Sequence, residues 1–75
     1  MPRIFSGPAL RTARRDAGLS VHDVATRVGR SCWQVYRYEQ GRTPVPVDVA
    51  DALAEAVDVP LDRLLWRDEL AEAAA

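Results

Sequence analysis

Apolar residues recur along the chain at the three- and four-residue spacing of amphipathic helices. The first stripe comprises Leu10, Ala13 and Ala17. Pro8, just before this stripe, suits the first turn of a helix, because its missing N–H leaves no bond unmade there. The pattern predicts a helix over residues 8–17. A second stripe follows the Pro-rich connector after residue 43 and predicts a later helix, with an apolar face of Val49, Ala50, Leu53, Ala54 and Val57.

Two shorter helices are predicted between these, and each begins with a capping pattern. Ser20 followed by Asp23 is a capping-box variant that starts a helix at residue 20, and a glycine at residue 29 ends it. Ser31 followed by Gln34 is a second capping box, which predicts a helix over residues 32–40. A short turn containing glycine is all that separates the two helices.

The end of the chain predicts a fifth helix and an acidic tail. Leu61, Leu64 and Leu65 form the apolar side of that short helix. No segment alternates between apolar and polar residues as a strand does, and a chain of 75 residues holds one small domain, so we expect an all-α fold. The expected segments are an N-terminal arm (1–7), a compact five-helix domain (8–66) and an Ala-rich acidic tail (67–75), which continues the last helix.

Charge divides the chain into two halves of opposite sign. Residues 1–45 carry a net charge of +5, whereas residues 46–75 carry −6, although the whole chain is close to neutral at −1. A basic face and an acidic back can orient a small protein on a polyanion. The alternative is that these charges are only solvated surface.

Candidate chemistry other than polyanion binding is sparse. Cys32 and His22 are the only cysteine and the only histidine, so the chain has neither an internal disulfide nor a zinc ligand set. They fall on different predicted helices without a third orienting residue, which argues against catalysis. We therefore expect no enzyme activity, no cofactor, no metal and no small-molecule ligand. No apolar run approaches the roughly 20 residues that span a bilayer, and we expect a cytoplasmic protein with no membrane partner.

Four motifs together resemble the phage-repressor (Cro/Xre-type) helix-turn-helix family. They are GLSVHDVA (18–25), VGRS (28–31), YEQGRTP (38–44) and VPLDRLL (59–65). The resemblance implies a lambda-repressor-like domain in which the helices over 20–28 and 32–40 form the helix-turn-helix. It also implies a sequence-specific DNA-binding regulator of transcription, a repressor in the simplest case. Its partners would be double-stranded DNA with an inverted-repeat operator and a second copy of the chain in a weak dimer.

The same resemblance assigns roles by position. The base-reading positions are Cys32, Trp33, Gln34 and Arg37. The phosphate contacts are Ser31, Arg42, Arg30, Arg27 and Arg11. An internal ion pair falls on Arg14 and Glu39. The Gln34 amide can both donate to and accept from adenine, and the Arg37 guanidinium can donate to the two acceptors of guanine. The alternatives are that Gln34 only caps its helix and that Arg37 only reaches a phosphate.

Several positions depart from the family pattern and keep a second interpretation open. Val21 stands where the family commonly has glutamine, so one phosphate anchor is missing, and Arg30 replaces a commonly apolar turn residue. Trp33 either covers a thymine methyl group or, with Tyr36, marks a protein-binding surface. The rival function is therefore a helix-turn-helix domain that binds another protein through Trp33 and Tyr36. Trp66 either contributes to a dimer contact or folds onto the core.

Overall fold

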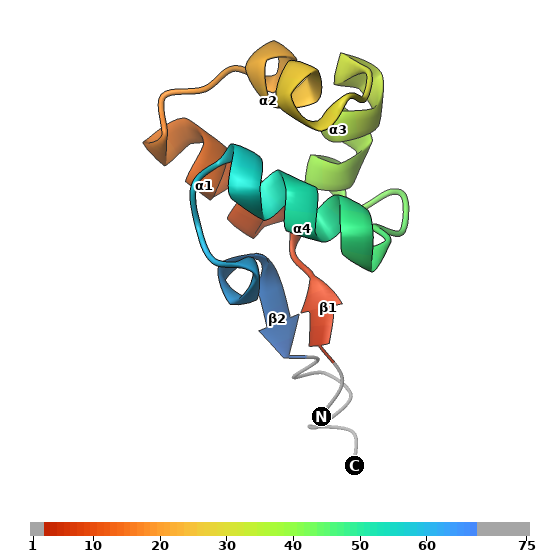
Figure 1. The fold of residues 1–75 in the computed structure, drawn as a ribbon. Helices are drawn as coiled ribbons and strands as arrows, with labels where there is room; N and C mark the ends of the chain where they lie inside the picture. Colours follow the sequence, from red (N-terminus) through yellow and green to blue (C-terminus); the bar gives the residue numbers. More distant parts are fainter. Residues whose placement is uncertain (1–2, 68–75) are drawn as a thin grey trace.

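The computed structural model describes residues 3–67 and consists mainly of four short helices. They are α1 (Gly7–Asp16), α2 (Val21–Val28), α3 (Cys32–Gln40) and α4 (Val47–Ala56), followed by one turn of 3-10 helix, η1 (Leu61–Leu64). Two three-residue strands, β1 (Arg3–Phe5) and β2 (Leu65–Arg67), pair antiparallel at the end of the molecule away from α2 and α3 (Figure 1).

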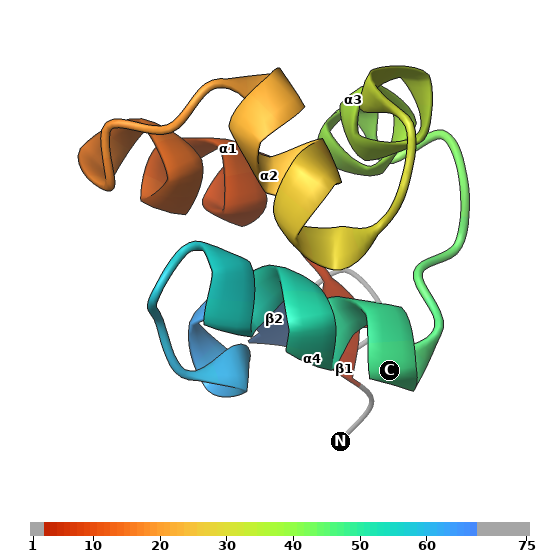
Figure 2. The same cartoon turned by 45° about the horizontal axis from the view of Figure 1, so that its top comes forward.

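The helices form two layers around one core. Figure 2 shows α1, α2 and α3 in one layer, with α4 and η1 beneath them. The largest fully buried side chains come from almost every element: Leu10, Val24, Val35, Leu53, Val57 and Leu64. All five apolar positions predicted for the face of α4 are buried, so that prediction is confirmed. Helix α3 packs mainly against α1 and α2, and its outer face carries the exposed side chains of Trp33 and Tyr36.

The prediction of a fifth helix is wrong. Leu61–Leu64 forms a single 3-10 turn, and Leu65–Arg67 then forms a strand that pairs with β1. In this pairing Phe5 lies opposite Leu65, and Arg3 lies opposite Arg67. The backbone N–H of Ser6 also donates to the carbonyl of Leu64 at 2.7 Å. Residues of the expected N-terminal arm therefore form hydrogen bonds with this segment, and these bonds favour an extended backbone over a helical one. Residues 68–75, most of the predicted tail, lie outside the described part of the chain.

The caps explain why the helices begin where they do. The capping box of α2 is complete: the Ser20 hydroxyl accepts from the N–H of Asp23 at 3.0 Å, and the Asp23 carboxylate accepts from the N–H of Ser20 at 2.9 Å. The second box forms only in part. The Ser31 hydroxyl accepts from the N–H of Gln34 at 3.1 Å, but the Gln34 amide donates to the Tyr38 hydroxyl instead of returning to the cap.

The cap of α2 makes a testable pH prediction. The hydrogen bonds from the Ser20 backbone and then from its hydroxyl hold the pKa of the Asp23 carboxyl below its ordinary value. Because the pKa is lower in the folded protein, the cap stabilises the fold above the ordinary aspartate pKa, and this contribution disappears as the pH falls through the lowered value. NMR titration of Asp23 should show the lowered pKa, and Ser20→Ala should move it part of the way back. An unshifted Asp23 in the parent protein would contradict this account.

Candidate nucleic-acid interface

The outward face of α3 carries two large aromatic side chains that are exposed to solvent. Val35 and Tyr38 are buried, and they anchor the inner side of the helix. Trp33 is 69% exposed and Tyr36 is 50% exposed on the outer side. Arg37 follows Trp33 by four residues and therefore lies along the same stripe. The helix thus presents two exposed aromatic rings to solvent, with the half-buried Arg37 beside Trp33.

The two remaining base-reading candidates lie at the first turn of α3, and each contacts a neighbour. Cys32 is exposed, and its Sγ is 3.5 Å from Nδ1 of His22 on α2. Gln34 is half-buried, and its Nε2 donates to the Tyr38 hydroxyl at 3.0 Å. Sequence reasoning missed both contacts. No spacing rule links residues 22 and 32, and the four-residue spacing of Gln34 and Tyr38 allows their hydrogen bond without selecting it. Among the described residues, no group of three or more His, Cys, Asp or Glu side chains is placed to hold a metal ion.

The phosphate candidates separate into two groups. Ser31, Arg30 and Arg42 flank the two ends of α3 and are exposed. Arg27 differs, because its Nη1 donates to the carbonyl of Ala56 at the end of α4, at 2.9 Å. This bond ties α2 to α4 and uses part of the guanidinium that had been expected at a phosphate.

Arg11, the last phosphate candidate, lies beside α3 rather than remote from it. Together with Arg15 and Tyr36 it lines a hollow of about 220 Å³ between α1 and α3. Arg15 was not among the predicted contacts, yet it is exposed and borders the same hollow. The signal that could have found it is its four-residue spacing from Arg11, which places both side chains on one stripe of α1.

The Arg14–Glu39 ion pair is present and is bidentate. Nε of Arg14 lies 2.7 Å from Oε2 of Glu39, and Nη2 lies 3.2 Å from Oε1. The third guanidinium nitrogen, Nη1, donates to the carbonyl of Leu19 at 2.8 Å. The two side chains are only 12% and 6% exposed. This pair joins α1, the turn after it and the last turn of α3, so it fixes the orientation of α3 and is not itself part of the outer surface.

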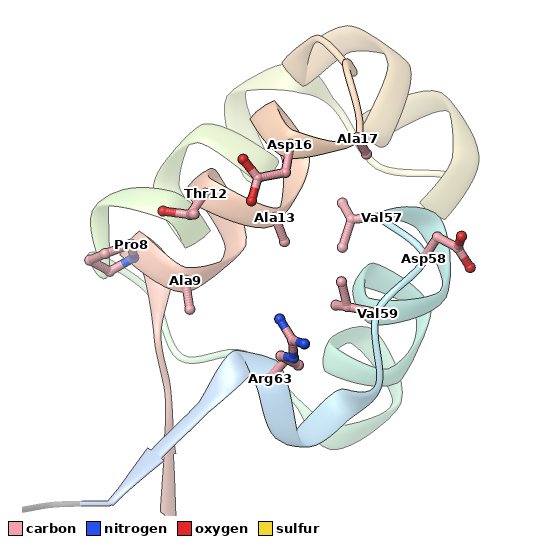
Figure 3. Close-up of a pocket in the computed structure, with 10 residues that line it drawn as sticks. All are labelled: Pro8, Ala9, Thr12, Ala13, Asp16, Ala17, Val57, Asp58, Val59 and Arg63. Atoms are coloured by element: carbon pink, nitrogen blue, oxygen red, sulfur yellow. The ribbon is translucent and has the colours of Figure 1, made fainter.

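A larger cavity lies on another side of the molecule. It is a groove of about 710 Å³ between α1 and the connection from α4 to η1, and no residue of α3 lines it (Figure 3). Its wall is mostly apolar, with the carboxylates of Asp16 and Asp58 and the guanidinium of Arg63 as its charged groups. None of the described helices is long and apolar enough to cross a membrane.

Helices α2 and α3, joined by a short turn at Gly29, have the arrangement of a helix-turn-helix, in which the second helix is supported by the first. A protein-family model described as a helix-turn-helix domain matches residues 7–66. The chain belongs to the helix-turn-helix domain family. The match covers all four helices and η1 of this helix-turn-helix domain.

Solved structures and a curated relative resemble the helix-turn-helix domain. The restriction-modification controller protein C.AhdI of Aeromonas hydrophila is 31% identical, with a TM-score of 0.74 over 77% of this chain and 88% of that one. The DNA-binding domain of the P22 c2 repressor is 22% identical, with a TM-score of 0.76 over 85% and 84% of the two chains, and shows the shared fold. A protein of Pyrobaculum aerophilum named as an HTH-type transcriptional regulatory protein is 43% identical over 49 residues, which are 65% of this chain. The matched part is 20% of that relative's length.

Proposed function

We propose that this helix-turn-helix domain is a sequence-specific DNA-binding regulator of transcription that represses by occupying an operator. The observation that carries the proposal is the uncovered face of α3, where Trp33 and Arg37 share one stripe on a helix held by its buried side. An α-helix fits the major groove of B-DNA, and arginine is the commonest reader of guanine there. The proposed base contacts are Cys32, Trp33, Gln34 and Arg37.

The backbone contacts proposed for this domain surround α3. Ser31, Arg30 and Arg42 lie at its two ends, and Arg11 lies beside it on α1. The acidic residues of α4, Asp48, Asp51 and Glu55, are exposed in the other layer, since α4 turns its apolar face to the core (Figure 2). This separation supports an electrostatic orientation of α3 toward a polyanion. Arg27 contributes to the position of α2 through its bond to α4.

A single α3 spans few base pairs, so the proposed operator is an inverted repeat bound by a weak homodimer. The decisive experiment is selection of duplexes from a random pool at about 0.1 M salt, where the screening length is about 10 Å. The expected result is an enriched pair of half-sites whose centres lie about 10 base pairs apart. A folded protein that enriches no sequence would overturn the proposal.

Substitution of Arg37 tests the reading assignment within the same selection. Arg37→Ala is expected to relax the preference at one base position by about 1–3 kcal/mol, because a bidentate contact to guanine is lost, while the other positions keep their preferences. Arg63→Ala, on the side of the molecule that α3 does not line, is the matched control and should leave the selected sequence unchanged. An unaltered sequence preference in the Arg37 variant would remove that residue from the base contacts.

The exposure of Trp33 and Tyr36 favours one second candidate, a protein-binding surface on the same face. Salt separates the two functions. With about four to six phosphate contacts per monomer, the logarithm of the DNA association constant should fall with the logarithm of salt concentration with a slope of about −4 to −5 for each monomer, and about twice that for the dimer. Binding that depends only weakly on salt and is abolished by Trp33→Ala would support the protein-binding function instead.

A further inference from the structure

We propose that Tyr38, which is buried, sets the base preference of this domain without contacting DNA, by holding the amide of Gln34 in a reading orientation. The inference rests on the proposed DNA-binding function and assigns a role within it. Tyr38 is only 3% exposed, and its ring packs in the core between the helices. Its hydroxyl nevertheless reaches the half-buried Gln34, whose Nε2 donates to it at 3.0 Å. The two residues are one helical turn apart on α3.

The remaining groups of the Gln34 amide match adenine. A glutamine amide has two N–H donors and one acceptor oxygen, and Tyr38 takes one donor. One N–H and Oε1 are left, and no other hydrogen bond among the described residues uses either of them. In the major groove, adenine offers an acceptor at N7 and a donor at N6, which is the complementary pair. The hydroxyl therefore leaves available the donor and acceptor that a contact with adenine requires.

The same hydrogen bond keeps Gln34 from its competing role as a capping residue. In a complete capping box the Gln34 side chain would return to the backbone N–H of Ser31, but here only the backbone half of the box forms. Tyr38 thus directs the amide away from the helix start. The core fixes the phenol ring of Tyr38. Its hydroxyl therefore restricts the Gln34 side chain, which otherwise has several rotatable bonds. A side chain ordered before binding loses less conformational freedom when it meets a base.

The test removes only the hydroxyl. In Tyr38→Phe, the adenine preference at one operator position should fall about three- to tenfold, which corresponds to the ordering of one flexible side chain. Preferences at the other positions and the thermal unfolding midpoint should change little. Thr12→Val is the control, because it removes a hydroxyl from an exposed residue on the side of the molecule that α3 does not line, and it should leave the adenine position unchanged. Gln34→Ala should lose the same preference, and adding Tyr38→Phe to it should cause no further change at that position.

A second measurement uses the free protein. The side-chain amide of Gln34 should show restricted motion in NMR relaxation and should become mobile in Tyr38→Phe, with the exposed Gln40 as a mobile reference on the same helix. A preference that is lost in Gln34→Ala but intact in Tyr38→Phe would overturn the inference. A uniform loss of affinity at every position would also overturn it, since that result marks a purely structural role. If the parent protein selects no sequence, the proposed function fails, and this inference fails with it.

Discussion

Arg14→Ala is expected to lower the free energy of unfolding by about 3–5 kcal/mol, the loss that follows when one partner of a buried ion pair is removed. The carboxylate of Glu39 would be left almost fully buried without its bidentate partner, and the carbonyl of Leu19 would lose its guanidinium donor. A domain of this length has a total stability of only about 4–11 kcal/mol, so much of the chain should be unfolded at modest denaturant concentrations. Urea unfolding monitored by circular dichroism measures the loss.

Two variants separate the ion pair from general surface charge. Arg15→Ala removes a neighbouring arginine that is exposed and should change stability by less than about 0.5 kcal/mol. Replacing Arg14 and Glu39 together by apolar residues of similar size should restore much of the stability lost in the single variant, since no buried charge is then left alone. An Arg14→Ala protein as stable as the parent would show that the pair does not hold α1 against α3.

Gly7→Ala is expected to destabilise the fold by about 3 kcal/mol, at the upper end of the usual range for overpacking. A Cβ atom at residue 7 would overlap the carbonyl oxygen of Glu39 and lie 2.7 Å from that of Tyr38. These are backbone atoms of the last turn of α3, so they have no rotamer in which to move aside. The first turn of α1 must therefore separate from α3. Thermal or urea unfolding measures the change.

The sign of the Gly7 result distinguishes close packing from helix propensity. Alanine is a better helix former than glycine by about 1 kcal/mol, so propensity alone predicts a more stable protein. Gly18→Ala is a useful comparison, because Gly18 has a φ of +72° but no atom within 4 Å of an added Cβ, and its variant reports backbone strain without a clash. A stabilised Gly7→Ala protein would contradict the close approach of α1 and α3.

Local signals account for most of what the sequence predicts about the fold. The limits of α3 are those predicted, Cys32–Gln40, because Ser31 caps the first turn and Gly41 follows the last with a φ of +70°. The sheet was not predictable in the same way. A three-residue strand is too short to show alternation, and β1 and β2 are brought together only by the fold of everything between them. The competing hydrogen bonds converted an expected helix into a 3-10 turn and a strand.

The sequence predicts which face of α3 is exposed, but it does not predict the individual contacts of the candidate interface. Burial of Val35 and Tyr38 determines which side of α3 is exposed, and their spacing is visible in the sequence. The Arg14–Glu39 pair came from family resemblance, since no local rule connects two residues on different helices. The hydrogen bonds of Arg27 to α4 and of Gln34 to Tyr38 depend on side-chain conformations that the packed structure selects. The sequence alone predicts a phosphate contact for Arg27 but not its bond to α4.

The short sheet has a consequence for how the domain can be attached to other molecules. Its register sets Arg3 opposite Arg67, so the two ends of the described chain are neighbours at about the spacing of paired strands, 4.7–4.9 Å. Both ends lie at the pole of the molecule remote from α3 (Figure 1). A tether, a fluorescent tag or a neighbouring domain joined at either end thus leaves from a single anchoring point. Helix α3, at the opposite pole, would stay uncovered by such an attachment.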